Sequence, residues 1–246
     1  MNFHVYIPAR YGASRLPGKP LLEFGGKPLV RHVWERAMAS GAASVVIATD
    51  DARIETAARA FGATVAMTDP ALPSGTDRIA AACAARGLAA DAVVVNVQGD
   101  EPHMPSAVIE QVARVVASGG CDMATVCEPL AAHQVFDTNV VKVVRDDDDR
   151  ALYFSRAAIP WDRDRYVRER EVGALDAYRR HVGIYAYRVG FLARFVALPP
   201  ARIEQLEALE QLRALAAGAV IRVPDAVAPC GRGVDTPADL ERLRAG

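Results

Sequence analysis

Short apolar runs alternate with helix-like stretches through the first half of the chain, and this alternation constrains the fold more than any other feature. The run AVVVNV at 92–97 predicts a buried strand, as do FHVYIP at 3–8 and SVVIA at 44–48. Helical spacing of apolar residues follows each run, and Gly41 and Gly62 stand where such helices end. Strands that alternate with helices form a parallel sheet covered on both faces, so an α/β fold is expected.

The pattern changes in the second half. Two strand-like segments, 140–145 and 151–155, flank the acidic run 146–149 and predict an antiparallel hairpin with a solvated turn rather than a metal site. HVGIYAY at 181–187 alternates as a strand, and 203–217 has the spacing of one long helix. We expect one domain with an inserted antiparallel lobe. Its parts are a nucleotide-binding α/β part over 1–128, a hairpin lobe over about 129–200 and a return to the main sheet over 201–246.

The amino-acid composition argues against two classes of binding partner, nucleic acids and membranes. The 29 lysine and arginine residues stand against 30 aspartate and glutamate residues, so the formal net charge of -1 gives no electrostatic footprint for nucleic acid. No apolar run approaches the roughly 18 residues of a membrane span, and the N-terminal residues lack the apolar stretch of a signal peptide. The four cysteines form no CxxC spacing. We therefore expect a cytoplasmic protein with reduced thiols that neither binds nucleic acid nor inserts into membranes.

Lysine is rare in this chain. Only Lys19, Lys27 and Lys142 are lysines among the 29 cationic residues. Arginine presents a planar fork and lysine a compact point charge, so these three positions are candidates for sites that favour the compact charge, with chance as the alternative.

The segment IPARYGASRLPGKPL, residues 7–21, follows the first predicted strand at the edge of the sheet where ligands bind. Gly12 and Gly18 let backbone N–H groups approach an anion, and the cluster of cations suits a triphosphate. Neither GxGxxG nor a P-loop motif occurs here, which argues against a nicotinamide dehydrogenase and a P-loop ATPase. The alternative is an ordinary loop with exposed charges. The cations are Arg10, Arg15 and Lys19.

Two acidic residues are candidates for holding Mg²⁺. Asp100, in QGDEP at 98–102, follows the strongest predicted strand, where a carboxylate can hold Mg²⁺ between phosphates. The alternative for Asp100 is a turn residue. Asp235 precedes Thr236, the expected cap of a last helix, and by position alone it is better explained as a helix-terminus acid.

The stretch SGTDR at 74–78 precedes a predicted helix. Ser74 and Asp77 have the spacing of a capping box. Hydroxyl groups and Arg78 at this helix start can also bind a cytosine and its ribose, and the two roles are compatible.

One face of the predicted strand 181–187 carries polar rings. His181, Gly183 and Tyr185 point to the same side because side chains alternate along a strand. A polyhydroxylated acid would suit this face, and a sheet face packed under a helix is an equally good interpretation from the residues alone.

Taken together, these motifs resemble the sugar nucleotidyltransferases, and most closely their cytidylyltransferase branch. The loop at 7–21 has the form SRLPGKPL, which is similar to that of the 3-deoxy-manno-octulosonate (Kdo) cytidylyltransferases. The resemblance runs nearly end to end, and its clearest departure is CGRG at 230–233. Further matching segments are ATDD (48–51), SGTDRIA (74–80), VVNVQGDEP (94–102), NVVKVV (139–144), ALYFSRAAIPWDRDR (151–165), HVGIYAYR (181–188), LEQLR (209–213) and GVDTPADLERLR (233–244).

The resemblance implies a Rossmann-like, mostly parallel sheet of nucleotidyltransferase type with an inserted antiparallel dimerisation lobe, and a homodimer. It implies that Pro8, Ala9, Arg10, Arg15, Lys19, Ser74, Gly75, Arg78 and Gln98 contact CTP. It implies that Gln98, Arg156, His181, Tyr185, Glu210 and Gln211 contact the sugar acid. The implied catalytic residues are Lys19, Asp100, Asp235 and Arg10, with Asp100 and Asp235 as the ligands of Mg²⁺. For Glu210, a solvated acidic helix face shared with Glu207 is the alternative.

The activity that the resemblance implies is transfer of CMP from CTP to Kdo, which activates the sugar for lipopolysaccharide synthesis. The sugar hydroxyl would attack the α-phosphorus and pyrophosphate would leave, with catalysis by positioning and charge stabilisation. The alternatives are another CMP-sugar-acid synthetase, a glycosyltransferase that uses a nucleotide sugar, and a non-catalytic nucleotide-binding relative. A glycosyltransferase would lack the cationic loop, and a non-catalytic relative would be expected to lose a metal acid or Lys19. The residues alone do not determine which sugar acid is used.

Overall fold

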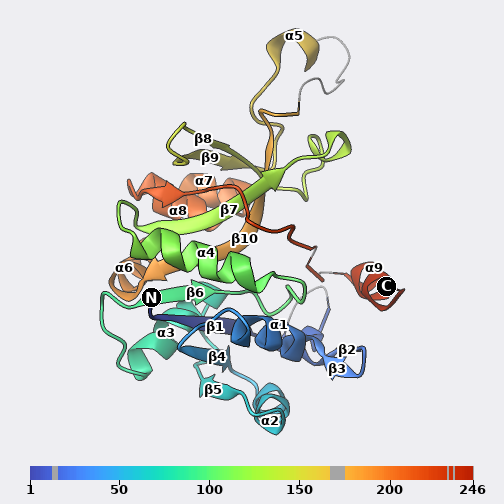
Figure 1. The fold of residues 1–246 in the computed structure, drawn as a ribbon, viewed down its shortest axis with the longest axis vertical. Coiled ribbons are helices and arrows are strands. Elements are labelled where there is room, and N and C mark those ends of the chain that lie inside the picture. The colour runs from blue at the N-terminus through green and yellow to red at the C-terminus, as the bar shows by residue number, and fades with distance from the viewer. Residues whose placement is uncertain (13–15, 167–174, 232, 235, 246) are drawn as a thin grey trace.

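The centre of the molecule is a nine-stranded sheet (Figure 1). The computed structural model describes residues 1–12, 16–166, 175–231, 233–234 and 236–245. The strands of the sheet are β1 (Phe3–Ala9), β4 (Ser44–Thr49), β5 (Thr64–Met67), β6 (Val93–Asn96), β7 (Met123–Pro129), β8 (Lys142–Arg145), β9 (Ala151–Ser155), β10 (Arg179–Arg188) and β11 (Ile221–Arg222). A separate two-stranded ribbon consists of β2 (Glu23–Phe24) and β3 (Lys27–Pro28).

The main row of strands has the order β11-β7-β10-β6-β1-β4-β5. Strands β5, β4, β1 and β6 are parallel neighbours. β10 is antiparallel to both β6 and β7, and β11 is parallel to β7, so β10 runs opposite to the rest of the row. The expected α/β class with a mostly parallel sheet is confirmed.

Helices cover both faces of this sheet, and alternate residues of β1 feed two separate cores. Val5 and Ile7 pack with residues of α1, α2 and α4 on one face. Tyr6 points the other way and packs with residues of α3, α6 and α8. The helices are α1 (Leu29–Met38), α2 (Ala52–Ala60), α3 (Gly75–Ala85), α4 (Ser106–Ala117), α5 (Arg163–Tyr166), α6 (Val189–Ala197), α7 (Arg202–Glu207), α8 (Gln211–Ala216) and α9 (Pro237–Ala245).

The predicted hairpin is present as β8 and β9. Its acidic tip is a turn, as expected, because the Asp146 carboxylate accepts hydrogen bonds from the backbone N–H groups of Asp148 (3.0 Å) and Arg150 (2.8 Å). β8 pairs with the first residues of β10, so the hairpin extends the main sheet. Figure 1 shows the hairpin toward the end of the molecule that α5 occupies, with α2 at the opposite end.

The prediction of a single helix over 203–217 is wrong. The chain forms α7 and α8, separated at Ala208, whose backbone lies in the left-handed region with φ 50°. The Arg156 guanidinium donates to the carbonyl of Glu207 (2.7 Å), at the end of α7. A tertiary hydrogen bond thus satisfies a carbonyl that a continuous helix would have used, and the break turns Gln211 inward. Local spacing of apolar residues could not reveal this.

Helix α6 was not among the expected elements. Its buried residues Phe191, Leu192 and Phe195 have helical spacing, and that signal was available in the sequence. In the described part of the chain, no helix combines the length and the apolar character needed to cross a bilayer.

A buried ion pair joins the end of β4 to α3. The Arg78 side chain is fully buried, and its guanidinium donates to Asp50 (2.7 Å) and to the hydroxyl of Thr68. Asp50 is also largely buried, with 13% of its side chain exposed. Removing one partner from a buried pair leaves an uncompensated charge, which costs much more than losing an exposed pair.

We expect Asp50→Asn to lower the free energy of unfolding by about 3 kcal/mol, because Arg78 would remain buried without its carboxylate. The matched control is Glu55→Gln, which removes the partner of the exposed Arg59 (2.9 Å) on α2 and should cost about 0.5 kcal/mol or less. Urea unfolding monitored by circular dichroism measures both changes. Equal losses in the two variants would contradict a structural role for the Asp50 and Arg78 pair.

Candidate active site

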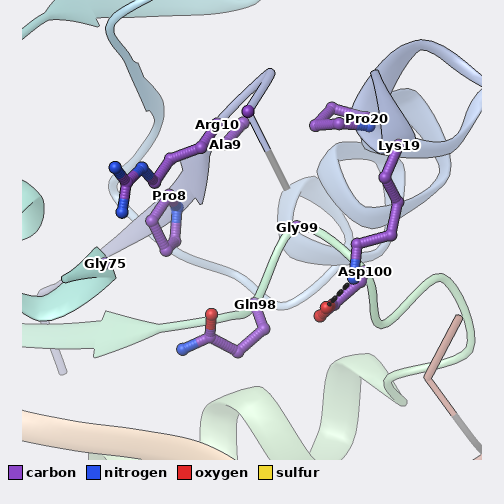
Figure 2. Close-up of a pocket in the computed structure, with 10 residues that line it drawn as sticks. Pro8, Ala9, Arg10, Lys19, Pro20, Gly75, Gln98, Gly99 and Asp100 are labelled. Atoms are coloured by element: carbon purple, nitrogen blue, oxygen red, sulfur yellow. Dashed lines mark hydrogen bonds and ion pairs between the residues drawn. The ribbon is translucent and has the colours of Figure 1, made fainter. Parts of the chain in front are cut away.

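A cleft of about 420 Å³ opens where β1 and β6 end (Figure 2). It lies at the carboxyl ends of parallel strands, the position at which open α/β sheets bind ligands. The structure gathers here seven residues that the sequence analysis assigned to CTP, to catalysis or to Mg²⁺. They are Pro8, Ala9, Arg10, Lys19, Gly75, Gln98 and Asp100, and Gly12, Pro20 and Gly99 complete the lining.

Two of the three glycines that line the cleft, Gly75 and Gly99, pack closely against Pro8. A Cβ atom on Gly99 would lie 2.8 Å from the carbonyl oxygen of Pro8, and one on Gly75 would lie 3.2 Å from the Pro8 ring. Any larger residue would push the turn after β6 or the start of α3 away from the end of β1. The tight contact brings residues from three distant segments of sequence around one cleft.

Lys19 and Asp100 form the central ion pair of the cleft. Lys19 Nζ donates to Asp100 Oδ2 at 2.6 Å, and Figure 2 shows the two side chains facing each other. Gly18 has φ 72° and its N–H donates to the Tyr11 carbonyl (2.8 Å), which folds the loop back and starts a short 3-10 helix at Lys19. The left-handed glycine therefore directs the lysine onto the aspartate.

Arg10 approaches the cleft from the other side. Its guanidinium donates to the Pro73 carbonyl (3.2 Å) and lies 3.9 Å from Asp50, and 43% of the side chain is exposed. Figure 2 shows it on the side of Gly75, away from Lys19. Asp50, which the sequence analysis quoted only within ATDD, thus anchors Arg10 as well as Arg78.

The start of α3 borders the cleft at Gly75, and its hydroxyl groups are tied to α8. Ser74 caps α3, since the Asp77 N–H donates to Ser74 Oγ (3.2 Å), which is one of the two bonds of the predicted capping box. The hydroxyl of Thr76 donates to Glu210 Oε2 (2.5 Å), and Ser74 Oγ lies 2.5 Å from Asp77 Oδ2 and 3.0 Å from Glu210 Oε1. Three predicted site residues are therefore absent from the linings of both cavities: Ser74, Arg78 and Glu210. Their contacts with CTP or with the sugar acid stay predictions.

A second cavity of about 590 Å³ adjoins the first, with Glu101 in its wall beside Asp100. Four residues predicted to contact the sugar acid line it, together with Gly183. The four are Arg156, His181, Tyr185 and Gln211. No site role was predicted for the rest of the wall, which is Gln134, Asp137, Asn139, Val140, Val141, Arg180, Leu209, Gly233, Thr236, Asp239 and Arg242. Most of these stand in quoted motifs: Asn139, Val140 and Val141 in NVVKVV, Leu209 in LEQLR, and Gly233, Thr236, Asp239 and Arg242 in GVDTPADLERLR.

The strand face of β10 presents neutral polar groups. Burial lowers the pKa of His181 to about 3, so its imidazole is uncharged near pH 7, and its Nε2 lies 3.1 Å from the hydroxyl of Thr125. Burial and the charge on Glu210 raise the pKa of Tyr185 well above its ordinary value, so the phenol keeps its proton. These groups can exchange hydrogen bonds with sugar hydroxyls, and positive charge in this cavity comes from arginines.

Gln211 carries the clearest sign of a bound polar molecule. Its side chain is 4% exposed, and its Nε2 has no hydrogen-bond partner among the residues that the structure describes. A buried donor without a partner costs free energy unless a ligand accepts from it. Gln98, predicted to touch both substrates, lines the first cavity only and donates to Asn96 (3.2 Å).

Two predicted residues, Arg15 and Asp235, lie outside the described residues. The backbone N–H of Val234, directly before Asp235, donates to the carbonyl of Asp100 (2.9 Å). Thr236 begins α9 as the predicted cap, with the Asp239 N–H donating to its hydroxyl (3.2 Å). The C-terminal segment therefore reaches the Asp100 turn.

The chain is similar to known cytidylyltransferases over its whole length. A family model described as cytidylyltransferase matches residues 5–221. The 3-deoxy-manno-octulosonate cytidylyltransferase of Aeromonas hydrophila is 52% identical and covers 100% of this chain and 98% of its own length. The 3-deoxy-manno-octulosonate cytidylyltransferase of Halorhodospira halophila is 55% identical, over 98% of this chain and 95% of its own length.

Solved structures agree. CMP:2-keto-3-deoxy-manno-octonic acid synthetase complexed with CTP superposes with a TM-score of 0.89 and 43% identity, over 99% of this chain and 97% of that one. A nucleotidyl transferase from Methanothermobacter, at 14% identity and a TM-score of 0.61 over 99% of this chain and 96% of its own, shares the fold. The cleft with its Lys19 and Asp100 pair thus sits in a shared architecture, and the chain belongs to the cytidylyltransferase family, in its group of 3-deoxy-manno-octulosonate cytidylyltransferases.

Proposed function

We propose that this protein transfers CMP from CTP to 3-deoxy-manno-octulosonate, releases pyrophosphate and depends on Mg²⁺. The observation that carries the proposal is the Lys19 and Asp100 ion pair, at 2.6 Å, in a cleft that adjoins a second cavity suited to a hydroxylated acid. The names of its 52–55% identical relatives and a solved relative complexed with CTP support this assignment.

The first cavity suits a nucleoside triphosphate. Arg10 and Lys19 supply positive charge from two sides, and the N-terminus of α3 at Gly75 supplies backbone N–H groups. Because β1, the turn after β6 and the start of α3 are packed together, these donors are held in place before the substrate binds. Such preorganised donors stabilise charge that develops in a transition state.

The second cavity suits the sugar acid. Arg156 and Arg180 offer guanidinium groups to its carboxylate, and His181, Tyr185 and Gln211 offer hydrogen bonds to its hydroxyls. Because its imidazole is neutral, His181 would not repel a cation and would not compete with the two arginines for the carboxylate of the sugar acid. The acid would thus bind beside the α-phosphate with its hydroxyl toward the first cavity.

Asp100 fits a Mg²⁺ ion. Mg²⁺ in nucleotide sites is commonly held by one or two carboxylates and by substrate phosphates, and the Asp100 carboxylate reaches the cleft with 28% of its side chain exposed. Among the described residues, which do not include Asp235, no group of three or more His, Cys, Asp or Glu side chains gathers as a metal site. Asp235 would be the second carboxylate. Bound Mg²⁺ would neutralise phosphate charge and lower the pKa of the sugar hydroxyl.

In the reaction, the sugar hydroxyl oxygen forms a bond to the α-phosphorus as the bond between that phosphorus and the pyrophosphate oxygen breaks. The hydroxyl proton goes to solvent. Lys19 holds the Asp100 carboxylate and stabilises the negative charge that builds on the phosphates. The chain's part is to align the hydroxyl, the phosphorus and the leaving group.

We also propose a cytoplasmic homodimer that serves lipopolysaccharide synthesis. The β8–β9 hairpin and the segment around α5 carry exposed apolar side chains, Leu152 (60%) and Trp161 (55%). A second copy would cover such side chains. Sedimentation or light scattering measures this state directly.

The assignment of substrates is tested by pyrophosphate release with each of four nucleoside triphosphates against a panel of ulosonic acids. We expect CTP with Kdo to be the most efficient pair, with a background rate when the acid is omitted. Faster turnover of another acid, such as N-acetylneuraminate, would overturn the choice of sugar. Equal rates with all four nucleotides would overturn the choice of CTP.

Lys19→Ala should lower kcat by about 10²–10³, because one preorganised charge beside the phosphates is lost, while CTP binding weakens less. Lys19→Arg should also be impaired, since a planar fork does not replace the ammonium that contacts Asp100. Lys27→Ala is the matched control, because Lys27 pairs with Glu35 (2.9 Å) away from both cavities. Steady-state kinetics and calorimetry of CTP binding separate the two effects. Ordinary turnover by Lys19→Ala would refute this role.

Asp100→Asn and Asp235→Asn should each abolish most activity at ordinary Mg²⁺ with little change in Tm, because each removes a charged oxygen ligand at constant size. The double variant should be no worse than the worse single one, since both would disable a single unit. Initial rates against Mg²⁺ for the four proteins measure this. An active Asp235→Asn enzyme with unchanged Mg²⁺ dependence would show that Asp235 is only a helix-terminus acid.

A further inference from the structure

A fully buried lysine lies behind the wall of the second cavity. Lys142, on β8, is 0% exposed, and its ammonium donates to the backbone carbonyls of Asp137 (2.8 Å), Val140 (2.6 Å) and Arg156 (2.6 Å). An ammonium has three N–H donors, and all of them are used. Arginine's planar fork could not place three donors around one point, which explains a lysine here in an arginine-rich chain.

The three carbonyls belong to two segments that line the cavity. Asp137, Asn139 and Val140 come from the loop before β8, and Arg156 follows β9. The Lys142 ammonium binds carbonyls of both segments. It therefore fixes their relative position at the point where they face the ligand.

Glu207, at the end of α7, holds the same peptide from the other side. Its carboxylate accepts from the backbone N–H of Arg156 (2.9 Å) and from the hydroxyl of Ser155 (2.6 Å). Both backbone polar groups of Arg156 are therefore bound by charged side chains, the N–H by Glu207 and the carbonyl by Lys142. Opposite charges on the two holders also offset the cost of burying the ammonium.

The Arg156 side chain is aimed by further backbone contacts. Its guanidinium donates to the carbonyls of Thr138 (3.0 Å), Glu207 (2.7 Å) and Ala208 (3.5 Å). A guanidinium has five N–H donors, so donors remain for a ligand in the cavity that Arg156 lines. A carboxylate is the group that two such donors recognise best.

We propose that Lys142 and Glu207 are positioning residues that hold the Arg156 peptide so that its guanidinium meets the carboxylate of the sugar acid. This inference rests on the proposed function. Neither residue lines the first cavity, so their loss should weaken binding of the acid and leave CTP binding intact. No contact of Lys142 or Glu207 with substrate is involved.

The test uses Lys142→Met and Glu207→Gln in the full chain. We expect the KM for Kdo to rise about tenfold or more in each, and the Kd for CTP by calorimetry to stay within about twofold. Lys142→Arg should not restore the wild-type KM, because its fork cannot reach three carbonyls. Lys27→Met is the control for losing a lysine away from both cavities, because Lys27 pairs with Glu35. Its kinetics should equal those of the wild type.

A readout specific to positioning is the comparison of Kdo with its C1 amide, which lacks the carboxylate charge. In the wild type the amide should have a much higher KM than the acid. In both variants the ratio of the two KM values should fall toward one, since a displaced guanidinium no longer distinguishes them. A purely structural defect would raise both KM values alike and keep the ratio.

The measurements distinguish failure of the positioning role from failure of the proposed function. An unchanged KM for Kdo, an unchanged ratio of amide to acid, or an equal loss of CTP affinity would overturn the positioning role. If Lys142→Met does not fold, Glu207→Gln decides, because it keeps the shape of the side chain. A wild-type enzyme that does not form CMP-Kdo would instead overturn the proposed function, since no variant enters that measurement.

Discussion

The contact between the end of β1 and the turn after β6 is the constraint on which the site depends. The Pro8 carbonyl oxygen lies so close to Gly99 that a Cβ atom would be only 2.8 Å away. Parallel pairing of the two strands sets this approach, and it carries the loop of Lys19 and the turn of Asp100 to one point. The ion pair of Lys19 and Asp100, which are 81 positions apart in the sequence, is therefore a consequence of sheet packing.

The two cavities differ in the kind of charge they present. The first has Arg10 and Lys19 around an acid, which suits a polyanion held with a metal ion. The second has neutral rings on β10, where burial keeps His181 unprotonated, and takes its positive charge from Arg156 and Arg180. Electrostatics as well as shape would thus favour a polyanion in the first cavity and a hydroxylated monoacid in the second.

Buried polar contacts link the segments that border these cavities. Glu210, directly before α8, accepts from the hydroxyl of Thr76 and lies 3.0 Å from that of Ser74, so α8 is held at the start of α3, which borders the first cavity. Lys142 and Glu207 fasten the loop before β8, the end of β9 and the end of α7 around the second. Such fully satisfied buried groups specify one arrangement of the chain more sharply than apolar contacts do.

The sequence by itself determined the α/β class, the hairpin and the cationic loop beside Asp100, because these follow from local periodicity and from loops at strand ends. The other predicted residues of the first cavity, Pro8, Ala9, Gly75 and Gln98, came from the resemblance to the cytidylyltransferases. It did not determine the break at Ala208, where Arg156 donates to a carbonyl of α7, or the burial of Lys142 against three backbone carbonyls. Nor did it show that Arg78, whose contact with the nucleotide stays a prediction, is buried beside Asp50. Only the tertiary structure decided these points, because each depends on hydrogen bonds between segments distant in sequence, and such bonds leave no local pattern.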